Sequence, residues 1–269
     1  MPELPEMETY RNLLSERIIN QEITSVVINR EKSINVSVDL FATTLLANKV
    51  ISIERRGKYL LFNLENEKCL LLHLMLGGLM YFGTSEDQPD RSKQIIISFS
   101  KSNLYFIGLR LGFLHLFSKD DAEQELSKLG PNPLSPDFTF ESFEKLIHKR
   151  KGILKTTLPN QSFLAGIGNC YSDEICFEAK LLPTRKLNEL NNQERENLFS
   201  AIKSVLVFAI KSGGYIEMPL YKDDTLTGGY NNRCKVYDRD NENCLRCGSK
   251  LEKKVISSRK TYFCPSCQK

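Results

Sequence analysis

The stretch CLRCGSKLEKKVISSRKTYFCPSC, residues 244–267, determines how the C-terminal part of the chain folds. It contains two Cys-x-x-Cys pairs separated by 16 residues, a spacing typical of a structural zinc site. Four thiolates leave no coordination position open, so the metal would stabilise a two-stranded hairpin that is too small to fold alone. A redox-active Cys-x-x-Cys, or thiols unrelated to a metal, are the alternatives. We predict one structural zinc ion with four ligands, which are Cys244, Cys247, Cys264 and Cys267.

Basic residues are concentrated in the same region. The last 26 residues hold seven Lys and Arg against one acidic residue, Glu252. Residues 151–269 hold 19 basic and 13 acidic residues, whereas residues 1–150 hold 18 and 20. A basic element indicates a polyanionic partner, although a solvated basic face would explain the same charges. Arg259 lies near the expected tip of the hairpin, where its bidentate donors could reach a phosphate.

Residues 164–174, LAGIGNCYSDE, form a glycine-rich turn that leads into a helix. Gly166 and Gly168 permit a tight turn with close backbone approach, and Asn169 lies where the helix would begin. The free N–H groups at a helix N-terminus bind phosphate readily, and Asn169 could add a side-chain donor. A helix–turn–helix with an ordinary asparagine cap is the alternative interpretation.

Apolar periodicity divides the chain into parts. Residues 3–19 have helical spacing, and short apolar runs such as KYLLFNL follow as far as about Phe117, which predicts a β-sandwich or barrel. After a polar segment that contains prolines, helical patterns begin with FTFESFEKLIHKR (138–150) and end at Gly213 and Gly214. We therefore expect a multi-domain α+β protein with an N-terminal helix and β-sandwich (1–118), a linker (119–134), a helical domain (135–229) and a zinc finger (230–269).

The N-terminus, MPELPE, could itself be reactive. Pro2 has a small ring, so Met1 is expected to be removed, which leaves a secondary amine. An α-amino group titrates at about 7.7–8.0, so this amine can attack a carbonyl carbon and give a cationic iminium that accepts electrons in an elimination. Glu3 lies beside it for proton transfer, and Glu6 could orient the terminus. In the alternative interpretation, Glu3 and Glu6 are acidic residues favoured at the start of a helix.

A further basic group follows a glycine in RRGKYLLF, residues 55–62. Lys58 stands after Gly57 at the start of a predicted strand. A lysine at such an edge is usually solvated, but it could contact a phosphate.

Four motifs, in order along the chain, together resemble the signatures of the formamidopyrimidine-DNA glycosylase/endonuclease VIII family. They are PELPEMET at the start, RRGKYLLF, LAGIGNCYSDE and the paired-cysteine finger, and LGPNPLS and KVYDR also match. The resemblance covers nearly the whole chain. It favours the catalytic interpretation of Pro2 over the alternative.

The resemblance implies a β-sandwich, a helix–two-turn–helix domain and a β-hairpin zinc finger that bind double-stranded DNA containing an abasic or damaged nucleotide, which is flipped from the duplex. Pro2 would attack C1′ of that nucleotide, and β,δ-elimination would cut the strand on both sides of it. Glu3 would act in ring opening and proton transfer, with Glu6 in support, and Lys58 would hold a phosphate near the lesion. The remaining residues implied to contact DNA are Asn169, Tyr171 and Arg259.

The residues that would fill the gap left by the flipped nucleotide depart from the family pattern. The family usually has a methionine after a His-Leu-Gly turn and then an Asp-Pro-Arg-x-Phe-Gly run, whereas this chain has HLMLGGL (73–79) and IGLRLG (107–112). Alignment places Leu76, Leu109 and Leu111 at the three positions. Leucine cannot hydrogen-bond the orphaned base as arginine would, although Arg110 is adjacent. A shift of one residue in the alignment would bring Arg110 to that position.

Two other departures concern base recognition. Asn160 stands where the family usually has aspartate, and residues 215–234 have about the length, but not the usual residues, of the loop that covers a flipped 8-oxoguanine. Because base specificity resides in such contacts, we expect intact lyase chemistry with altered base recognition.

We expect a base-excision-repair DNA glycosylase and AP lyase that acts at abasic or oxidised-base sites, without a firm assignment to 8-oxoguanine. The alternative from another class is a protein that recognises damaged or abasic DNA with little catalysis. A general zinc-finger transcription factor would explain neither the N-terminus nor Lys58. No run of 18 apolar residues and no secretory signal is present, so we expect the protein in the cytoplasm, associated with the nucleoid. We also expect it to be a monomer.

Overall fold

The computed structural model describes residues 1–148 and 150–269, which divide into two compact units. The predicted linker contains the boundary at 127–128, but the segment 216–229 belongs to the first unit and not, as expected, to the helical domain. The first unit comprises Met1–Pro2, Glu6–Ser127 and Ile216–Gly229. The second unit comprises Glu3–Pro5, Lys128–Tyr215 and Tyr230–Lys269.

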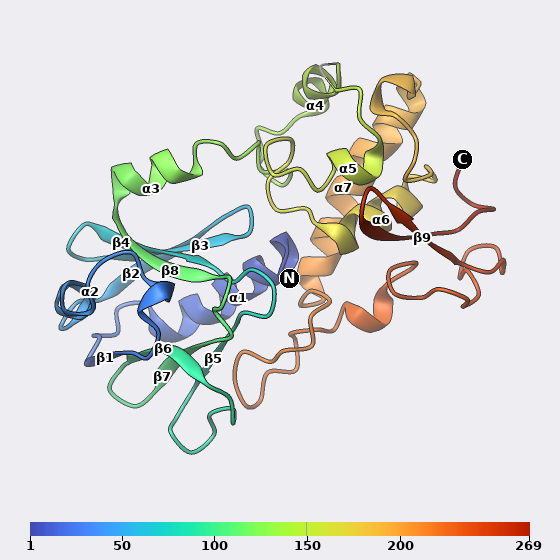
Figure 1. Ribbon diagram of the computed structural model, residues 1–269. Helices are drawn as coiled ribbons and strands as arrows, with labels where there is room; N and C mark the ends of the chain where they lie inside the picture. The colour runs from blue at the N-terminus through green and yellow to red at the C-terminus, as the bar shows by residue number, and fades with distance from the viewer. Residues whose placement is uncertain (149) are drawn as a thin grey trace. The chain divides into compact units, whose positions relative to one another are not determined.

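The first unit is a β-sandwich of two four-stranded antiparallel sheets, as predicted (Figure 1). One sheet has the order β1-β6-β7-β5 and the other the order β2-β3-β4-β8. Leucine, isoleucine and phenylalanine side chains of both sheets form one core. The strands are β1 (Ser25–Ile28), β2 (Val50–Arg56), β3 (Tyr59–Leu64), β4 (Lys68–His73), β5 (Leu79–Gly83), β6 (Lys93–Ser98), β7 (Asn103–Ile107) and β8 (Phe113–Ser118).

Helix α1 (Leu4–Ile18) confirms the prediction for residues 3–19. Its Met7, Tyr10, Leu14 and Ile18 recur every three or four residues and are buried in the core of the sandwich. Two further helices of this unit, α2 (Val38–Leu45) and α3 (Lys119–Leu126), were not predicted, and a short 3₁₀ turn, η1, spans Glu31–Ser33.

The predicted linker contains α3 because its polar sequence still has helical signals. The Ser118 hydroxyl accepts a hydrogen bond from Asp121 N–H and caps the helix. Ala122 and Leu126, four residues apart, bury their side chains on one face. Two apolar positions in eight residues are a weak signal in the sequence.

The segment 216–229 is fixed to the sandwich by a buried leucine. Leu220 is fully buried in the core of the first unit, and its carbonyl accepts a hydrogen bond from Phe82 N–H at 2.6 Å. Asp224 closes the following turn, since its carboxylate accepts hydrogen bonds from Leu220, Leu226 and Thr227. Residues 216–229 of the loop that the sequence assigns to base recognition are therefore a folded part of the first unit.

The second unit contains the helical domain. Its helices are α4 (Phe140–Ile147), α5 (Leu154–Thr157), α6 (Asn169–Glu178) and α7 (Asn192–Lys211), and a 3₁₀ turn, η2, spans Leu187–Glu189. Lys149 of the predicted helical stretch 138–150 lies outside the described residues. A capping box of Asn191 and Glu194 starts α7, and Gly213 and Gly214, both with positive φ, end it as predicted.

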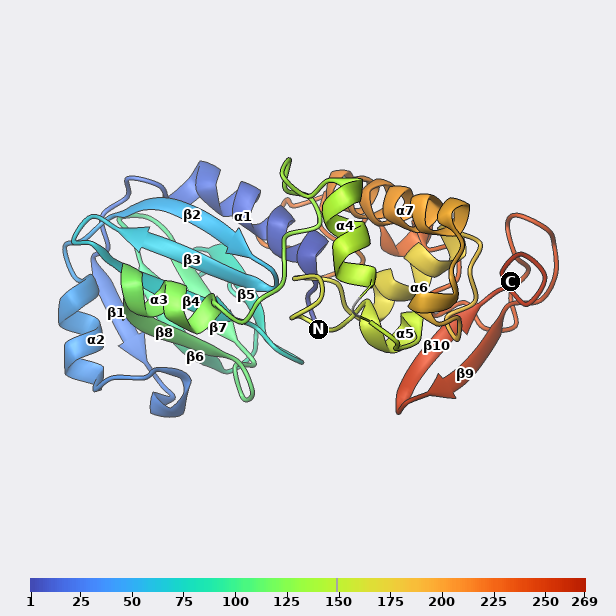
Figure 2. The same cartoon turned by 90° about the horizontal axis from the view of Figure 1, so that it is seen from above.

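The rest of the second unit is the zinc finger, in which β9 (Glu252–Ile256) and β10 (Arg259–Phe263) form an antiparallel hairpin (Figure 2). Ser257 and Ser258 both have positive φ, as a two-residue hairpin turn requires. A 3₁₀ turn, η3 (Asn231–Arg233), precedes the finger. Within the described ranges, no helix combines the length and apolar character that crossing a bilayer requires.

Candidate functional site

The carboxylate of Glu3 occupies the N-terminus of α6. It accepts hydrogen bonds from the backbone N–H groups of Gly168 (2.6 Å), Cys170 (3.0 Å) and Tyr171 (3.4 Å). Gly168, the residue before the helix, supplies no side-chain cap, so Glu3 takes that role from a distant part of the sequence. The positive end of the helix dipole therefore faces a buried carboxylate.

A second backbone contact holds the same segment. Leu4 N–H donates to the carbonyl of Gly166 at 2.9 Å. Gly166 has φ of +103°, and a Cβ built on it would lie 2.7 Å from the side chain of Leu4. The glycine at this position thus permits the close approach of residues 3 and 4 to the turn before α6. The N–H groups that the sequence offered to a phosphate are those that bind Glu3.

The two other residues of the predicted N-terminal site, Pro2 and Glu6, are both buried. Pro2 is buried and is covalently bonded to Glu3, whereas Met1 is exposed. Glu6 is fully buried in the first unit, where its negative charge, second to burial, raises the pKa of Tyr10. Neither acid is therefore a solvated residue at the start of its own helix.

Lys58 is buried rather than solvated at the turn between β2 and β3, with 4% of its surface exposed. Burial and, second to it, the positive charge of Lys58 lower the pKa of His73 to about 4. Neutral His73 accepts a hydrogen bond at Nδ1 from Met75 N–H (3.1 Å), which shapes the turn before Leu76. Lys58 and His73 are thus parts of one buried polar group.

Helix α6 carries two residues that we expected to contact DNA, and their side chains differ in exposure. Asn169 is half-buried, and its side-chain Nδ2 donates to the carbonyl of Lys260 in β10 (3.0 Å). Its Oδ1 is buried and accepts no hydrogen bond from the described residues. Tyr171, which we expected to contact DNA, is fully buried and packs edge-on against Tyr215. The ring belongs to the core of the second unit, and the expected contact of Tyr171 with DNA stays a prediction.

The four predicted zinc ligands lie together. The Sγ atoms of Cys244, Cys247, Cys264 and Cys267 all lie within 4.8 Å of one another. Two pairs are 3.9 Å and 3.6 Å apart. Tetrahedral coordination with Zn–S bonds of about 2.3 Å requires sulfurs about 3.8 Å apart, so the residues fit the metal.

Arg259 is the first residue of β10 and is exposed next to the hairpin turn, as expected. The finger has its own small core, which includes Val236, Leu251 and Tyr262 beside two of the cysteines. Arg246, between the first cysteine pair, donates to the carbonyl of Phe177 at the end of α6 (2.9 Å). The metal site and α6 thus both support the strand that carries Arg259.

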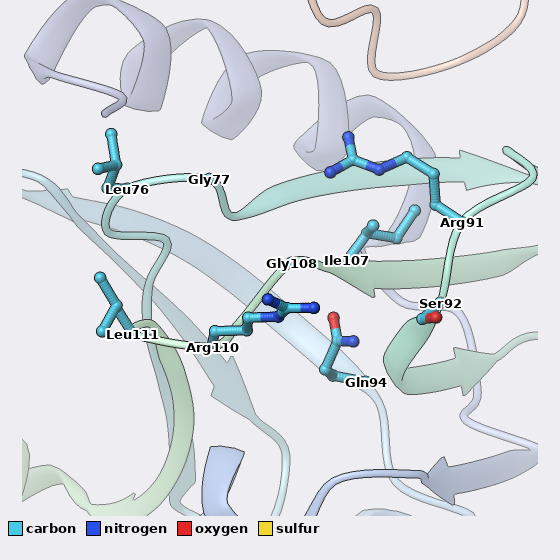
Figure 3. A pocket seen from close by; sticks show the side chains of 9 residues that line it. All are labelled: Leu76, Gly77, Arg91, Ser92, Gln94, Ile107, Gly108, Arg110 and Leu111. Atoms are coloured by element: carbon cyan, nitrogen blue, oxygen red, sulfur yellow. The ribbon is translucent and has the colours of Figure 1, made fainter.

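Two of the three gap-filling positions line a hollow of about 570 Å³ in the first unit (Figure 3). Leu76 and Leu111 line it and are 67% and 64% exposed. Leu109 is fully buried in the core, and its N–H donates to Gln94 Oε1 (3.2 Å). Arg110 is exposed and lines the hollow. The turn after Gly108 directs Leu109 inward and exposes Arg110, and the assignment of Leu109 to the gap stays a prediction.

Models of known protein families match three parts of the chain. Residues 1–113 match the formamidopyrimidine-DNA glycosylase N-terminal domain, residues 129–218 its H2TH domain, and residues 241–269 the zinc finger found in FPG and IleRS. The formamidopyrimidine-DNA glycosylase of Listeria monocytogenes is 35% identical over 100% of both chains, and that of Desulfitobacterium hafniense is 34% identical over 100% of both. The chain belongs to the formamidopyrimidine-DNA glycosylase family.

Solved structures agree with the assignment to the formamidopyrimidine-DNA glycosylase family. The Lactococcus lactis Fpg in complex with DNA containing an abasic site has a TM-score of 0.92 and 30% identity over 99% of both chains. The wild-type Lactococcus lactis Fpg with DNA containing N7-benzyl-Fapy-dG has a TM-score of 0.91 and 31% identity over 100% of both. The chain is a base-excision-repair DNA glycosylase of a family that has glycosylase and AP lyase activity, with one structural zinc site.

Sequence reasoning on this glycosylase missed a buried ion pair. Lys155 Nζ lies 2.6 Å from Asp173 Oδ1, and neither side chain is exposed. Burial raises the pKa of Asp173 to about 7, while the charge of Lys155 and the N–H of Tyr262 act to lower it. The only signal in the sequence is that Asp173 lies four residues after Asn169, on the same face of the helix.

Proposed function

We propose that this glycosylase acts through the N-terminal amine of Pro2 on abasic and oxidised-base sites in double-stranded DNA. The observation that carries the proposal is the position of Glu3, which is bonded to Pro2 and accepts hydrogen bonds from three N–H groups of the α6 N-terminus. These bonds fix the residue next to the nucleophile and so restrict where the amine can lie.

The proposed reaction begins after removal of Met1. The Pro2 nitrogen, in its neutral form, attacks C1′ of the damaged nucleotide, and the bond from C1′ to the base breaks as the base takes up a proton. Opening of the sugar ring gives a cationic iminium between Pro2 and C1′. Loss of a proton from C2′ expels the 3′ phosphate, and a second elimination expels the 5′ phosphate. At an abasic site the same iminium forms with loss of water.

Three side chains have proposed roles beside the amine. Glu3 transfers protons during ring opening, with Glu6 in support, and Lys58 holds a phosphate next to the lesion. The positive charge of Lys58, which also lowers the pKa of His73, supports this role, because a phosphate is a fitting counter-charge for an ammonium group. Arg259 and Asn169 hold phosphates from the second unit, and Arg259 is already exposed for this purpose.

We further propose that Leu76, Arg110 and Leu111 enter the gap left by the flipped nucleotide. Two exposed leucines supply apolar wedges, and the guanidinium of Arg110 supplies donors for the orphaned base. This replaces Leu109, which is fixed in the core. The protein would act as a monomer on nucleoid DNA in the cytoplasm.

Borohydride trapping tests the proposal. An iminium on a duplex with an abasic site is reduced to a stable amine that links protein and DNA. We expect an adduct with the wild-type protein, a strongly reduced yield with Pro2→Gly, whose primary amine gives an imine in place of the permanently charged iminium, and full yield with Pro5→Ala, which changes the other proline of the segment but not the terminal amine. Wild-type yield in Pro2→Gly would overturn the requirement for a secondary amine at the N-terminus.

A duplex with 8-oxoguanine, tested alongside, separates the activities. An adduct on both duplexes identifies a glycosylase that accepts 8-oxoguanine. An adduct on the abasic duplex alone identifies lyase action with a different base preference. Tight binding without an adduct on either duplex would favour a protein that only recognises damaged DNA.

A further inference from the structure

Strand β10 has one edge that pairs with β9 and one that faces α6. In an antiparallel pair, every second residue turns its N–H and C=O away from the partner strand. Lys260 and Tyr262 are two residues apart and make their bonds on this outer edge. Asn169 Nδ2 donates to Lys260 O (3.0 Å), and Tyr262 N–H donates to Asp173 Oδ2 (3.0 Å).

The spacing of the two bonding residues on α6 matches the spacing of their two partners on β10. Asn169 and Asp173 are four residues apart in α6, a rise of about 6 Å along one helix face. Residues two apart in a strand are separated by about 6.8 Å. The helix thus presents a donor and an acceptor with the spacing that a third strand would provide. Side chains of α6 satisfy the outer edge of β10.

The acceptor in this contact is a buried charge with a full set of partners. Lys155 Nζ donates to Asp173 Oδ1 (2.6 Å), Asn169 O (3.2 Å) and Ser172 Oγ (3.3 Å), which uses the three donors of an ammonium group. A buried ion pair is often no more stable than apolar residues of the same volume. Its use here is geometric, since an apolar pair would leave Tyr262 N–H without its acceptor.

We propose that Lys155, Asn169 and Asp173 form a clamp that fixes β10 on α6 and thereby positions Arg259 for its phosphate. Arg259 precedes Lys260 directly, so the first clamp bond is one residue from the side chain that would grip DNA. Asp173 is then a positioning residue, and in the DNA-free protein Asn169 belongs to the structure that supports Arg259. The clamp rests on the proposed role of Arg259 and does not depend on the chemistry of Pro2.

The experiment compares Asp173→Asn, Arg259→Ala and the double variant in full-length, zinc-loaded protein. The control is Ser172→Ala, which removes one partner of Lys155 without touching the strand edge. The ligand is a duplex with a tetrahydrofuran abasic analogue, which binds but cannot react. Dissociation constants at fixed salt, zinc content and hydrogen exchange at the Tyr262 amide are measured.

We expect Asp173→Asn to retain one zinc, to increase exchange at Tyr262 and to weaken binding about tenfold, the scale of one charge-assisted hydrogen bond. In the Arg259→Ala background the same change should weaken binding less than about twofold, because the residue it positions is absent. Ser172→Ala should bind as the wild type does. Unchanged Tyr262 exchange in Asp173→Asn, or effects of the two substitutions that multiply, would overturn the clamp.

If Asp173→Asn does not fold, the double variant Lys155→Met with Asp173→Leu replaces the ion pair by apolar residues. This protein should fold, retain zinc and show the same loss of affinity, and wild-type affinity would overturn the clamp. Binding of the analogue and borohydride trapping test the clamp and the Pro2 chemistry separately. Wild-type protein that binds the analogue but gives no trapped adduct contradicts the Pro2 chemistry alone.

Discussion

The backbone N–H of Gly168 donates to the carboxylate of Glu3 at 2.6 Å, across 165 residues of sequence. This contact gives one acidic residue two functions. Glu3 caps the helix that carries Asn169, and it is the neighbour of the amine that we propose as nucleophile. A change at Glu3 should therefore alter stability as well as activity.

Glu3→Gln should lower the free energy of unfolding by about 1–2 kcal/mol, because the N–H donors and the positive end of α6 lose a negative charge. Urea unfolding at neutral pH measures the effect. Glu16→Gln is the control, since that side chain is 72% exposed on α1. Equal midpoints for the two variants would show that the cap contributes nothing to stability.

The environment of His73 predicts a pH dependence. Burial and the charge of Lys58 lower the pKa of His73 from 6.5 to about 4. Between these values the unfolded chain binds a proton that the folded protein excludes, so the contribution of His73 to stability falls as the pH drops from about 6.5 to about 4. The difference in unfolding free energy between wild type and His73→Asn should follow this course. A difference independent of pH would contradict it.

Loss of the metal should unfold the finger, and the strand that holds Arg259 would then be lost as well. Cys264→Ser should contain no zinc, and binding to an abasic duplex should fall below detection. Cys69→Ala is the matched control, because Cys69 is buried in the sandwich and lies outside the cysteine cluster. Zinc content and fluorescence anisotropy measure the two quantities. Full binding by the zinc-free variant would contradict the prediction.

The positions of Leu109 and Arg110 predict opposite effects of two substitutions. Leu109→Arg should destabilise the protein by about 3 kcal/mol or more, because it places a charge in the core. Arg110→Ala should leave the melting temperature unchanged and reduce discrimination among the four bases opposite an abasic site. Thermal unfolding and binding to the four duplexes measure these effects. A folded Leu109→Arg variant of normal stability would contradict the burial of residue 109 in the core and would support its position in the gap.

The sequence was sufficient for features set by local pattern. Helix α7 could be predicted because apolar spacing is sustained over many residues and two glycines end it. The zinc ligands could be predicted because their spacing reflects the geometry of one metal site. The orientation of the side chains after Gly108 could not be predicted, because the turn at this glycine decides which of them faces outward.

Tertiary partners were beyond the sequence for a different reason. The bonds from Glu3 to α6 join residues that only folding brings together. The same holds for Asp173, whose partners Lys155 and Tyr262 lie on either side of it in the chain at long separations. The burial of Lys58 was also beyond the sequence, because position along a strand does not report the depth of burial.

The burial of Leu220 in the sandwich determines when the first unit can finish folding during synthesis. The first unit is discontinuous in sequence, and its core includes a leucine that follows the whole helical domain. A ribosome that has released residues up to 127 has delivered both sheets but not the residue whose carbonyl binds Phe82 N–H. A fragment ending there would expose the site where Leu220 packs. The sandwich is therefore completed late in synthesis, after α7 has emerged.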